Sequence, residues 1–140
     1  LNAVCDDLEG DSTPQIIKLH TLQHLATVFK GHLRENEGIL RVVEMLHPTP
    51  AVGGVPSEAA LEMIRQLEGD RGFYAAPLGW VDAEGEGEFN VAIRSALISG
   101  NQATLFAGAG IISGSDPDLE LKETDLKFQP ILSALGGSET

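Results

Sequence analysis

The spacing of hydrophobic residues changes several times along this chain of 140 residues. Between Leu22 and Leu33 apolar and polar positions alternate, which predicts a β-strand. Two later stretches place apolar residues three and four positions apart, the spacing of one helix face. The first helix is expected after Asn36, a fair N-cap, and the second after Ser57, which is expected to cap it. Their buried faces consist of Ile39, Val42, Val43 and Leu46, and of Leu61, Ile64 and Leu67.

Strand-like patterns separated by turn residues dominate the second half of the chain. Because short connections join these strands, they are expected to pair as an antiparallel meander. One connection is the acidic, glycine-rich segment 83–87, and the other is the Gly100-Asn101 turn. The predicted strands cover residues 73–82, 88–99 and 102–111.

A final helix is predicted from Asp116, an N-cap followed by proline at the first helical position, toward Leu135. Pro130 removes a backbone hydrogen bond inside this helix, so a kink or a break is expected near Phe128. The order of elements favours an α+β fold, with helices packed against the antiparallel meander. The expected organisation is a loop or disordered end at 1–14, a folded portion at 15–135 and a tail at 136–140.

The excess of acidic over basic residues argues against some classes of binding partner. Twenty-one acidic and nine basic residues give a formal net charge of −12. Because such a field repels phosphate backbones and anionic lipid heads, it speaks against nucleic acid and membrane partners. The chain also has no apolar run near the ~20 residues that span a bilayer. Its single cysteine, Cys5, cannot form an internal disulfide, which favours a cytoplasmic location.

The last predicted helix carries a candidate metal and anion site. Glu120, Glu123 and Lys127 are spaced three and four residues apart, so they project from one helix face. Two carboxylates and an ammonium group in this arrangement could hold Mg²⁺ and a carboxylate substrate together. The same spacing is also common on an ordinary solvated helix, so the pattern alone leaves both interpretations open.

Arg94 is a second candidate, in the predicted strand 88–99. Strand alternation would give it small neighbours, which leave room beside a guanidinium group whose donors suit a carboxylate. An arginine on the polar side of a strand is also a common surface residue. The expected apolar face consists of Phe89, Val91, Ile93 and Leu97, and the opposite face of Asn90, Ala92, Arg94 and Ala96.

The glycines between Ala107 and Ile111 suggest a nucleotide-binding loop at first sight. The third glycine of that motif would fall at Ser113, and no βαβ unit precedes the segment, so a dinucleotide site is not expected. Glycines within a strand more often mark a close approach of a ligand or of another backbone. Gly108 is therefore a candidate contact residue.

Five segments in one order resemble the C-terminal part of the chorismate-binding enzymes, and the isochorismate synthases most closely. The resemblance begins near Pro14, is strong from His24 and stops at the tail. Members of this family are well over twice as long and this chain opens on Leu1, so it is expected to be about one half of the anthranilate synthase component I-like fold. The segments are LHPTPAVGG, GFYAAPLGWVD, GEFNVAIRSALI, LFAGAGIISGSDP and ELKETDLK.

The resemblance implies roles for residues of the second half. Glu123 matches the glutamate that binds Mg²⁺, with Glu120 as a supporting member of the metal site, and Lys127 faces the substrate. Arg94 is similar to an arginine that grips a chorismate carboxylate. Gly108 is expected to present its backbone N–H to the substrate carboxylate. Chorismate is a dianion, so a protein of this charge needs such local positive groups.

Two positions of the first half also match the family. His24 opens a segment that resembles the family's HLAT, whose histidine lies near the ring hydroxyl, although a lone histidine is most often structural or on the surface. Ala51 lies where anthranilate-type relatives carry a threonine-containing loop followed by a lysine. The alanine, and the absence of a lysine after Pro56, favour the water-using isochorismate synthases over the ammonia-using or lyase members.

The resemblance thus implies a parent enzyme that converts chorismate to isochorismate with Mg²⁺, for siderophore, menaquinone or salicylate biosynthesis. A lysine base activates the water that attacks ring carbon 2, and a glutamic acid protonates the hydroxyl that leaves carbon 4. Both residues, and a second metal-binding glutamate, belong to the missing N-terminal part. The isolated chain is therefore expected to be inactive.

Two alternatives remain open. The parent could be another chorismate-utilising enzyme, a lyase of the salicylate or anthranilate synthase type, because only the Ala51 region separates these activities. The chain could also be a non-catalytic binding or assembly fragment whose exposed sheet edge pairs with a second copy.

Overall fold

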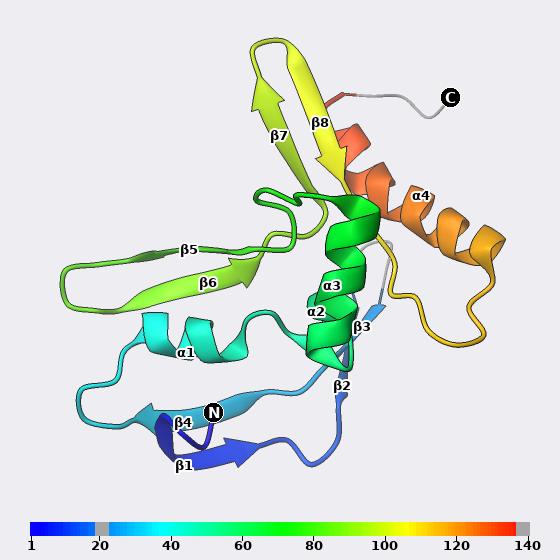
Figure 1. The fold of residues 1–140 in the computed structure, drawn as a ribbon. Helices are drawn as coiled ribbons and strands as arrows, with labels where there is room; N and C mark the ends of the chain where they lie inside the picture. The colour runs from blue at the N-terminus through cyan, green and yellow to red at the C-terminus, as the bar shows by residue number, and fades with distance from the viewer. Residues whose placement is uncertain (19–22, 137–140) are drawn as a thin grey trace. The chain divides into compact units, whose positions relative to one another are not determined.

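The computed structural model describes residues 1–18 and 23–136, and it confirms an α+β fold with antiparallel strand pairs (Figure 1). The chain forms two compact units. Unit 1 comprises Leu1–Leu46 and Val81–Gly87, and unit 2 comprises His47–Trp80 and Glu88–Thr140. Among the described residues, none of the helices combines the length and the apolar content needed to cross a membrane.

Unit 1 contains two antiparallel strand pairs and one helix. Strand β1 (Cys5–Gly10) pairs with β4 (Phe29–Leu33), and β2 (Gln15–Lys18) pairs with β3 (Gln23–Ala26). The irregular end expected for residues 1–14 is therefore wrong for β1. The alternating stretch expected as one strand is divided between β3 and β4, because the two parts pair with different partners; Leu22 lies outside the described residues.

Helices are confirmed in both stretches with helical apolar spacing, as α1 (Ile39–Leu46) and α3 (Ser57–Glu68), but neither contains a buried residue, so the predicted burial of one face is wrong. Ser57 is the first residue of α3 and Pro56 is its N-cap, so the assignment of Ser57 as a cap is also wrong. The assignment of Asn36 as the cap of α1 is wrong, because the helix begins three residues later. Asn36 instead has a φ of 66°, in the left-handed region that asparagine tolerates better than most residues. Asn36 thus lies in a turn before the helix.

The proline-rich segment that joins α1 and α3 contains one short helical turn, α2 (Pro50–Gly53). The turn is closed by hydrogen bonds from the N–H groups of Gly53 and Gly54 to the carbonyls of Thr49 and Pro50. Gly53 is buried, and a Cβ atom there would approach Pro48 to 3.0 Å. Close packing thus fixes the shape of this segment.

The expected meander is resolved into two hairpins. Strand β5 (Pro77–Val81) pairs with β6 (Gly87–Val91), and β7 (Ser95–Ser99) pairs with β8 (Gln102–Phe106). The Gly100-Asn101 turn is confirmed between β7 and β8. The first and third predicted strands extended too far, and the second is interrupted between β6 and β7.

The last helix, α4 (Pro117–Ala134), begins as predicted. The Asp116 carboxylate accepts hydrogen bonds at 3.0 Å from the N–H groups of Asp118 and Leu119, which satisfies two donors that the first helical turn leaves without partners. The break expected near Phe128 is not found, because α4 continues past Pro130.

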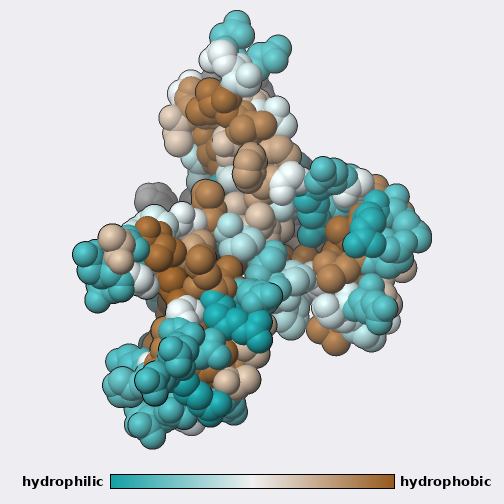
Figure 2. All heavy atoms as spheres, turned by 60° about the vertical axis from the view of Figure 1, so that its left-hand side comes forward, coloured by the Kyte–Doolittle hydropathy of each residue, from teal (hydrophilic) through white to brown (hydrophobic). Residues whose placement is uncertain are grey.

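The described residues bury little apolar surface. Within residues 1–18 and 23–136, only two hydrophobic residues, Val4 and Ala75, are buried, while large side chains such as Trp80 and Ile98 are 57% and 64% exposed. Figure 2 shows apolar patches between the polar regions of the surface. The accessible surface is 10918 Å². Two separate compact units of this total mass would expose roughly 8,400 Å², so the chain exposes more surface than such units would.

This apolar exposure leads to a prediction for the isolated chain. It is expected to dimerise or aggregate, because exposed strand edges and apolar patches find partners. The net charge of −12 opposes contact most strongly at low ionic strength, so association should increase with salt. Light scattering at low and high salt measures the effect. A monomer in both conditions at high protein concentration would contradict the prediction.

Candidate functional site

The open end of the β7–β8 hairpin carries two of the candidate residues. Ser95 and Phe106 form the pair at this end of the ladder, so Arg94 precedes the pair by one residue and Gly108 follows it by two. Paired strands lie about 5 Å apart, so these two segments leave the hairpin side by side. The hairpin thus brings Arg94 and Gly108, which are distant in the sequence, close together in space.

The structure corrects the local conformation of both residues. Arg94 does not lie in a strand: it occupies the bend between β6 and β7 with a φ of 49°. A left-handed conformation costs a residue with a side chain about 1–2 kcal/mol, and such strain is found preferentially at binding sites. Gly108 lies beyond β8, which ends at Phe106, so it belongs to an irregular segment instead of a strand.

Tyr74 is a site residue that the sequence analysis missed. Its ring stacks on Phe106 with a centroid distance of 5.7 Å. Its hydroxyl oxygen would lie 2.6 Å from a Cβ atom at position 108, so only glycine fits there without movement of the tyrosine. Burial raises the pKa of the Tyr74 phenol, which keeps the hydroxyl protonated at neutral pH.

Backbone hydrogen bonds bring Tyr74 close to the bend that contains Arg94. The N–H of Ala75 donates to the Ala92 carbonyl at 2.9 Å, and the N–H of Ala92 donates to the Ala76 carbonyl at 2.8 Å. Ala75 also has a positive φ, 64°, and is buried. Both segments therefore turn sharply at the place where they pair. The only available signal was the position of Tyr74 inside the GFYAAPLGWVD segment.

Lys127 connects α4 to the segment after β8. Its ammonium group donates to the Gly108 carbonyl oxygen at 2.9 Å and contacts Oε1 of Glu123 at 2.5 Å. The lysine side chain is 16% exposed, whereas that of Glu123 is 52% exposed. A partly buried cation thus lies directly beside Gly108. Three candidate residues, Gly108, Glu123 and Lys127, are thus joined by contacts of the lysine side chain.

Glu120 lies one helical turn before Glu123. Its Oε1 accepts a hydrogen bond from the Ser115 hydroxyl at 2.7 Å, and that hydroxyl accepts one from the Ile112 N–H at 3.1 Å. The loop before α4 thereby fixes the orientation of the Glu120 carboxylate. The three-residue spacing places Glu120 and Glu123 on the same helix face.

The two carboxylates fit a magnesium ion only as part of its coordination shell. Mg²⁺ is typically held by one or two carboxylates together with waters and substrate oxygens. Lys127 contacts only Oε1 of Glu123, so the second carboxylate oxygen can face a cation. Across residues 1–18 and 23–136, no group of three or more histidine, cysteine, aspartate or glutamate side chains could hold a metal ion. Further ligands would have to come from outside these residues.

The two remaining candidates lie in different units. Ala51 is exposed on α2, and the carbonyl of the next residue, Val52, accepts a hydrogen bond from Arg71 at 2.8 Å. Arg71 in turn lies over the Tyr74 ring, with its Cζ 5.7 Å from the centroid. His24 belongs to unit 1, where its backbone pairs with Ile17, and its side chain lies outside the described residues.

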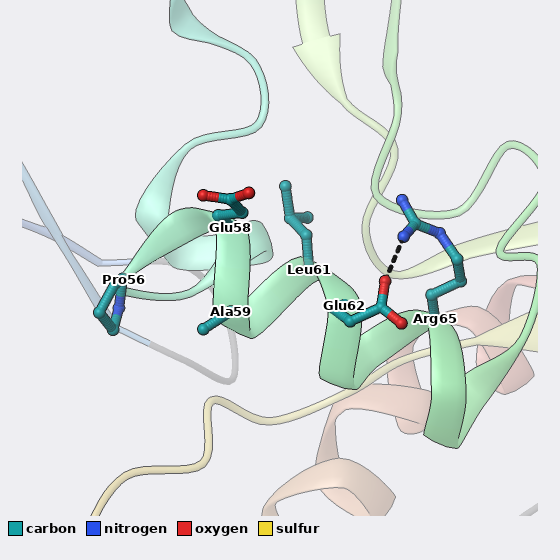
Figure 3. Close-up of a pocket in the computed structure, with 6 residues that line it drawn as sticks. All are labelled: Pro56, Glu58, Ala59, Leu61, Glu62 and Arg65. Carbon is teal, nitrogen blue, oxygen red and sulfur yellow. Dashed lines mark hydrogen bonds and ion pairs between the residues drawn. The ribbon is translucent and has the colours of Figure 1, made fainter.

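A surface hollow runs along α3 (Figure 3). It has a volume of about 710 Å³. Two of its three charged side chains, Glu62 and Arg65, pair with each other at 2.5 Å. No candidate residue lines it; the lining comprises Pro56, Glu58, Ala59, Leu61, Glu62 and Arg65.

A smaller hollow of about 210 Å³ lies within unit 2 beside the candidate residues. Val52, Arg71, Tyr74 and Ala75 contribute to its lining. We regard this hollow as the more relevant one, because it is bounded by side chains that contact the Ala51 segment and Gly108.

Known proteins resemble this chain over nearly its entire length. The sequence model of a family described as chorismate binding enzyme matches residues 1–136. The isochorismate synthase MenF of Bacillus subtilis is 50% identical over 95% of this chain, and the salicylate biosynthesis isochorismate synthase of Pseudomonas aeruginosa is 52% identical over 93%. The chain spans 28% of the length of each of these curated relatives.

Solved structures give the same result for the fold. A crystal structure from Bacillus anthracis, assigned as the 2,3-dihydroxybenzoate-specific isochorismate synthase DhbC, has a TM-score of 0.92 and 42% identity, covering 98% of this chain and 37% of its own. The menaquinone-specific isochorismate synthase MenF of Escherichia coli has a TM-score of 0.81 and 36% identity, covering 93% and 30%. Together with the family match over residues 1–136, these similarities show that the chain belongs to the chorismate binding enzymes.

Proposed function

We propose that this chain is the C-terminal part of a cytoplasmic isochorismate synthase, which converts chorismate to isochorismate with Mg²⁺. The observation that carries the proposal is the cluster at the open end of the β7–β8 hairpin. It contains Gly108, the Lys127 ammonium that donates to the Gly108 carbonyl, and the Tyr74 hydroxyl beside Gly108. The segment that contains Arg94 adjoins the same end of the hairpin.

This cluster suits a dianionic substrate in a protein whose net charge is −12. Arg94 can offer a carboxylate two parallel N–H donors, and the Lys127 ammonium has three. The Gly108 N–H and the Tyr74 hydroxyl can add neutral donors. Because Lys127 is mostly buried, its attraction for a carboxylate is screened less by water than that of a surface lysine. The chain's own residues would thus bind and orient chorismate.

Glu123, with support from Glu120, would hold the magnesium ion. Bound Mg²⁺ would neutralise and orient a substrate carboxylate as a Lewis acid. The Ser115 hydroxyl and the Lys127 ammonium orient these two glutamates, which prepares the helix face for a cation. The general base and the general acid of the reaction would be supplied by the part of the parent enzyme that this chain does not include.

The identity of the product tests this proposal against the lyase alternative. Ala51 stands where the lyase-type relatives carry a threonine-containing loop, which supports the isomerase reaction. Full-length parent enzyme incubated with chorismate and Mg²⁺ is expected to form isochorismate, seen by chromatography, without release of pyruvate. Salicylate with stoichiometric pyruvate, or anthranilate with stoichiometric pyruvate when an ammonium salt is added as nitrogen source, would contradict the proposal.

A further inference from the structure

Each of the three nitrogen atoms of the Arg71 guanidinium group donates one described hydrogen bond. Its Nε and Nη2 atoms donate to the two carboxylate oxygens of Glu68, each at 2.7 Å, and its Nη1 donates to the Val52 carbonyl at 2.8 Å. The Glu68 carboxylate raises the pKa of Arg71, so the guanidinium remains charged at every pH that the fold tolerates. The side chain therefore holds one fixed position after the end of α3.

The two other arginine–glutamate pairs with the same spacing differ from this one. The Arg41–Glu44 and Arg65–Glu62 pairs have arginine side chains that are 51% and 71% exposed, whereas Arg71 is 23% exposed. Neither of these arginines has a described contact with a backbone carbonyl outside its own helix. Pairs of that exposed kind contribute little to stability. Only the Arg71 pair extends to a second segment of the chain.

The contact of Arg71 with Val52 has a clear local cause. Helix α2 is a single turn of four residues, so its last carbonyl groups have no intrahelical donors. The guanidinium supplies the missing donor for the Val52 carbonyl, and its positive charge is favourable at the C-terminal end of a helix. The contact thus fixes the turn that carries Ala51.

Arg71 is also joined to Tyr74 in two ways. Its carbonyl accepts a hydrogen bond from the Tyr74 N–H at 2.9 Å, and its guanidinium lies 5.7 Å from the centroid of the Tyr74 ring. Tyr74 in turn stacks on Phe106 and stands against Gly108. One side chain therefore connects the Ala51 turn to the segment that carries Gly108.

We propose that Arg71 is a positioning residue of the substrate site: it sets the separation between the Ala51 turn and the wall formed by Tyr74 and Gly108. This inference rests on the proposed function, because both of these parts are expected to contact chorismate. A displacement of this wall would move the groups that are expected to bind chorismate out of position. The effect should fall on substrate binding, since Arg71 lies behind the wall and contacts its residues.

The test compares Arg71→Met with Arg65→Met in the full-length enzyme. Both changes remove a guanidinium group from an arginine–glutamate pair, but Arg65 has no described contact with the Ala51 turn. Arg71→Met is expected to raise KM for chorismate about 10-fold or more, and Arg65→Met to leave it unchanged. Arg71→Lys should give an intermediate KM, because a lysine keeps the charge and offers a single donor nitrogen.

A purely structural role predicts a different outcome. Partial unfolding of Arg71→Met would reduce the fraction of active enzyme, so kcat would fall and KM would stay unchanged. If the wild type forms isochorismate, this result would overturn the inference and leave the proposed function intact. Should the wild type form no isochorismate, the proposed function fails, and hydrogen exchange then decides about Arg71. Faster exchange of the Gly53 and Gly54 amides in Arg71→Met than in Arg65→Met would support the positioning role. Equal exchange rates would overturn it.

Discussion

Full-length enzyme carrying Glu123→Gln is expected to lose about 100-fold or more in kcat/KM for chorismate. The substitution keeps the shape of the side chain and removes the charge that would bind Mg²⁺. Changes to groups that merely support metal ligands already reduce metal affinity or activity by ~10–100-fold, so loss of a direct ligand should reduce it at least as much. Because the Glu123 side chain is 52% exposed, the fold should be little affected. Steady-state rates over a range of Mg²⁺ concentrations measure the effect.

Asp125→Asn provides the matched control for this experiment. Asp125 lies on the same helix, is exposed and loses one negative charge in the same way. We expect its activity and its magnesium requirement to equal those of the wild type. Wild-type activity at wild-type Mg²⁺ concentration in Glu123→Gln would instead identify Glu120, Glu123 and Lys127 as an ordinary solvated helix face.

The isolated chain of 140 residues is expected to form no isochorismate from chorismate and Mg²⁺. The cluster around Gly108 can bind a carboxylate, but the groups that would activate water and protonate the leaving hydroxyl are proposed to lie elsewhere in the parent. General acid and base groups each contribute typically ~10²–10⁴-fold, so their joint absence should remove detectable turnover.

Chromatography of the reaction mixture, with full-length enzyme at equal concentration as the positive control, measures this result. Light scattering of the same sample distinguishes inactivity of a dispersed chain from loss by aggregation. Turnover near the rate of the full-length enzyme would contradict the proposed division of the catalytic groups.

Local signals in the sequence were sufficient for some elements and insufficient for others. The start of α4 was predicted correctly because the Asp116 cap and the following proline act within one helical turn. The strand across Arg94 was predicted wrongly because a period of two does not reveal a left-handed residue. That conformation is imposed by the pairing of Ala75 and Ala76 with Ala92, which joins distant parts of the sequence.

In the candidate site too, local contacts could be predicted from the sequence and contacts between distant residues could not. Glu123 and Lys127 are four residues apart on a helix, so their contact follows from the helical repeat. The contact of Lys127 with Gly108 was not predicted, because the two residues are nineteen positions apart in the sequence. Tyr74 and Arg71 were missed, since their contacts depend on the stacking on Phe106 and on the position of the Val52 carbonyl.

The two contacts of Lys127 have a consequence for the entropy of ligand binding. A lysine that becomes immobile loses up to ~1.5–2 kcal/mol of rotamer freedom. Here the Gly108 carbonyl and the Glu123 carboxylate already restrict the side chain, so most of this loss occurs during folding. An ammonium group has three N–H donors, and two acceptors leave capacity for a third. An anion that binds at Gly108 thus meets a donor that is already ordered. Its binding free energy therefore includes less of the entropy cost of immobilising the lysine.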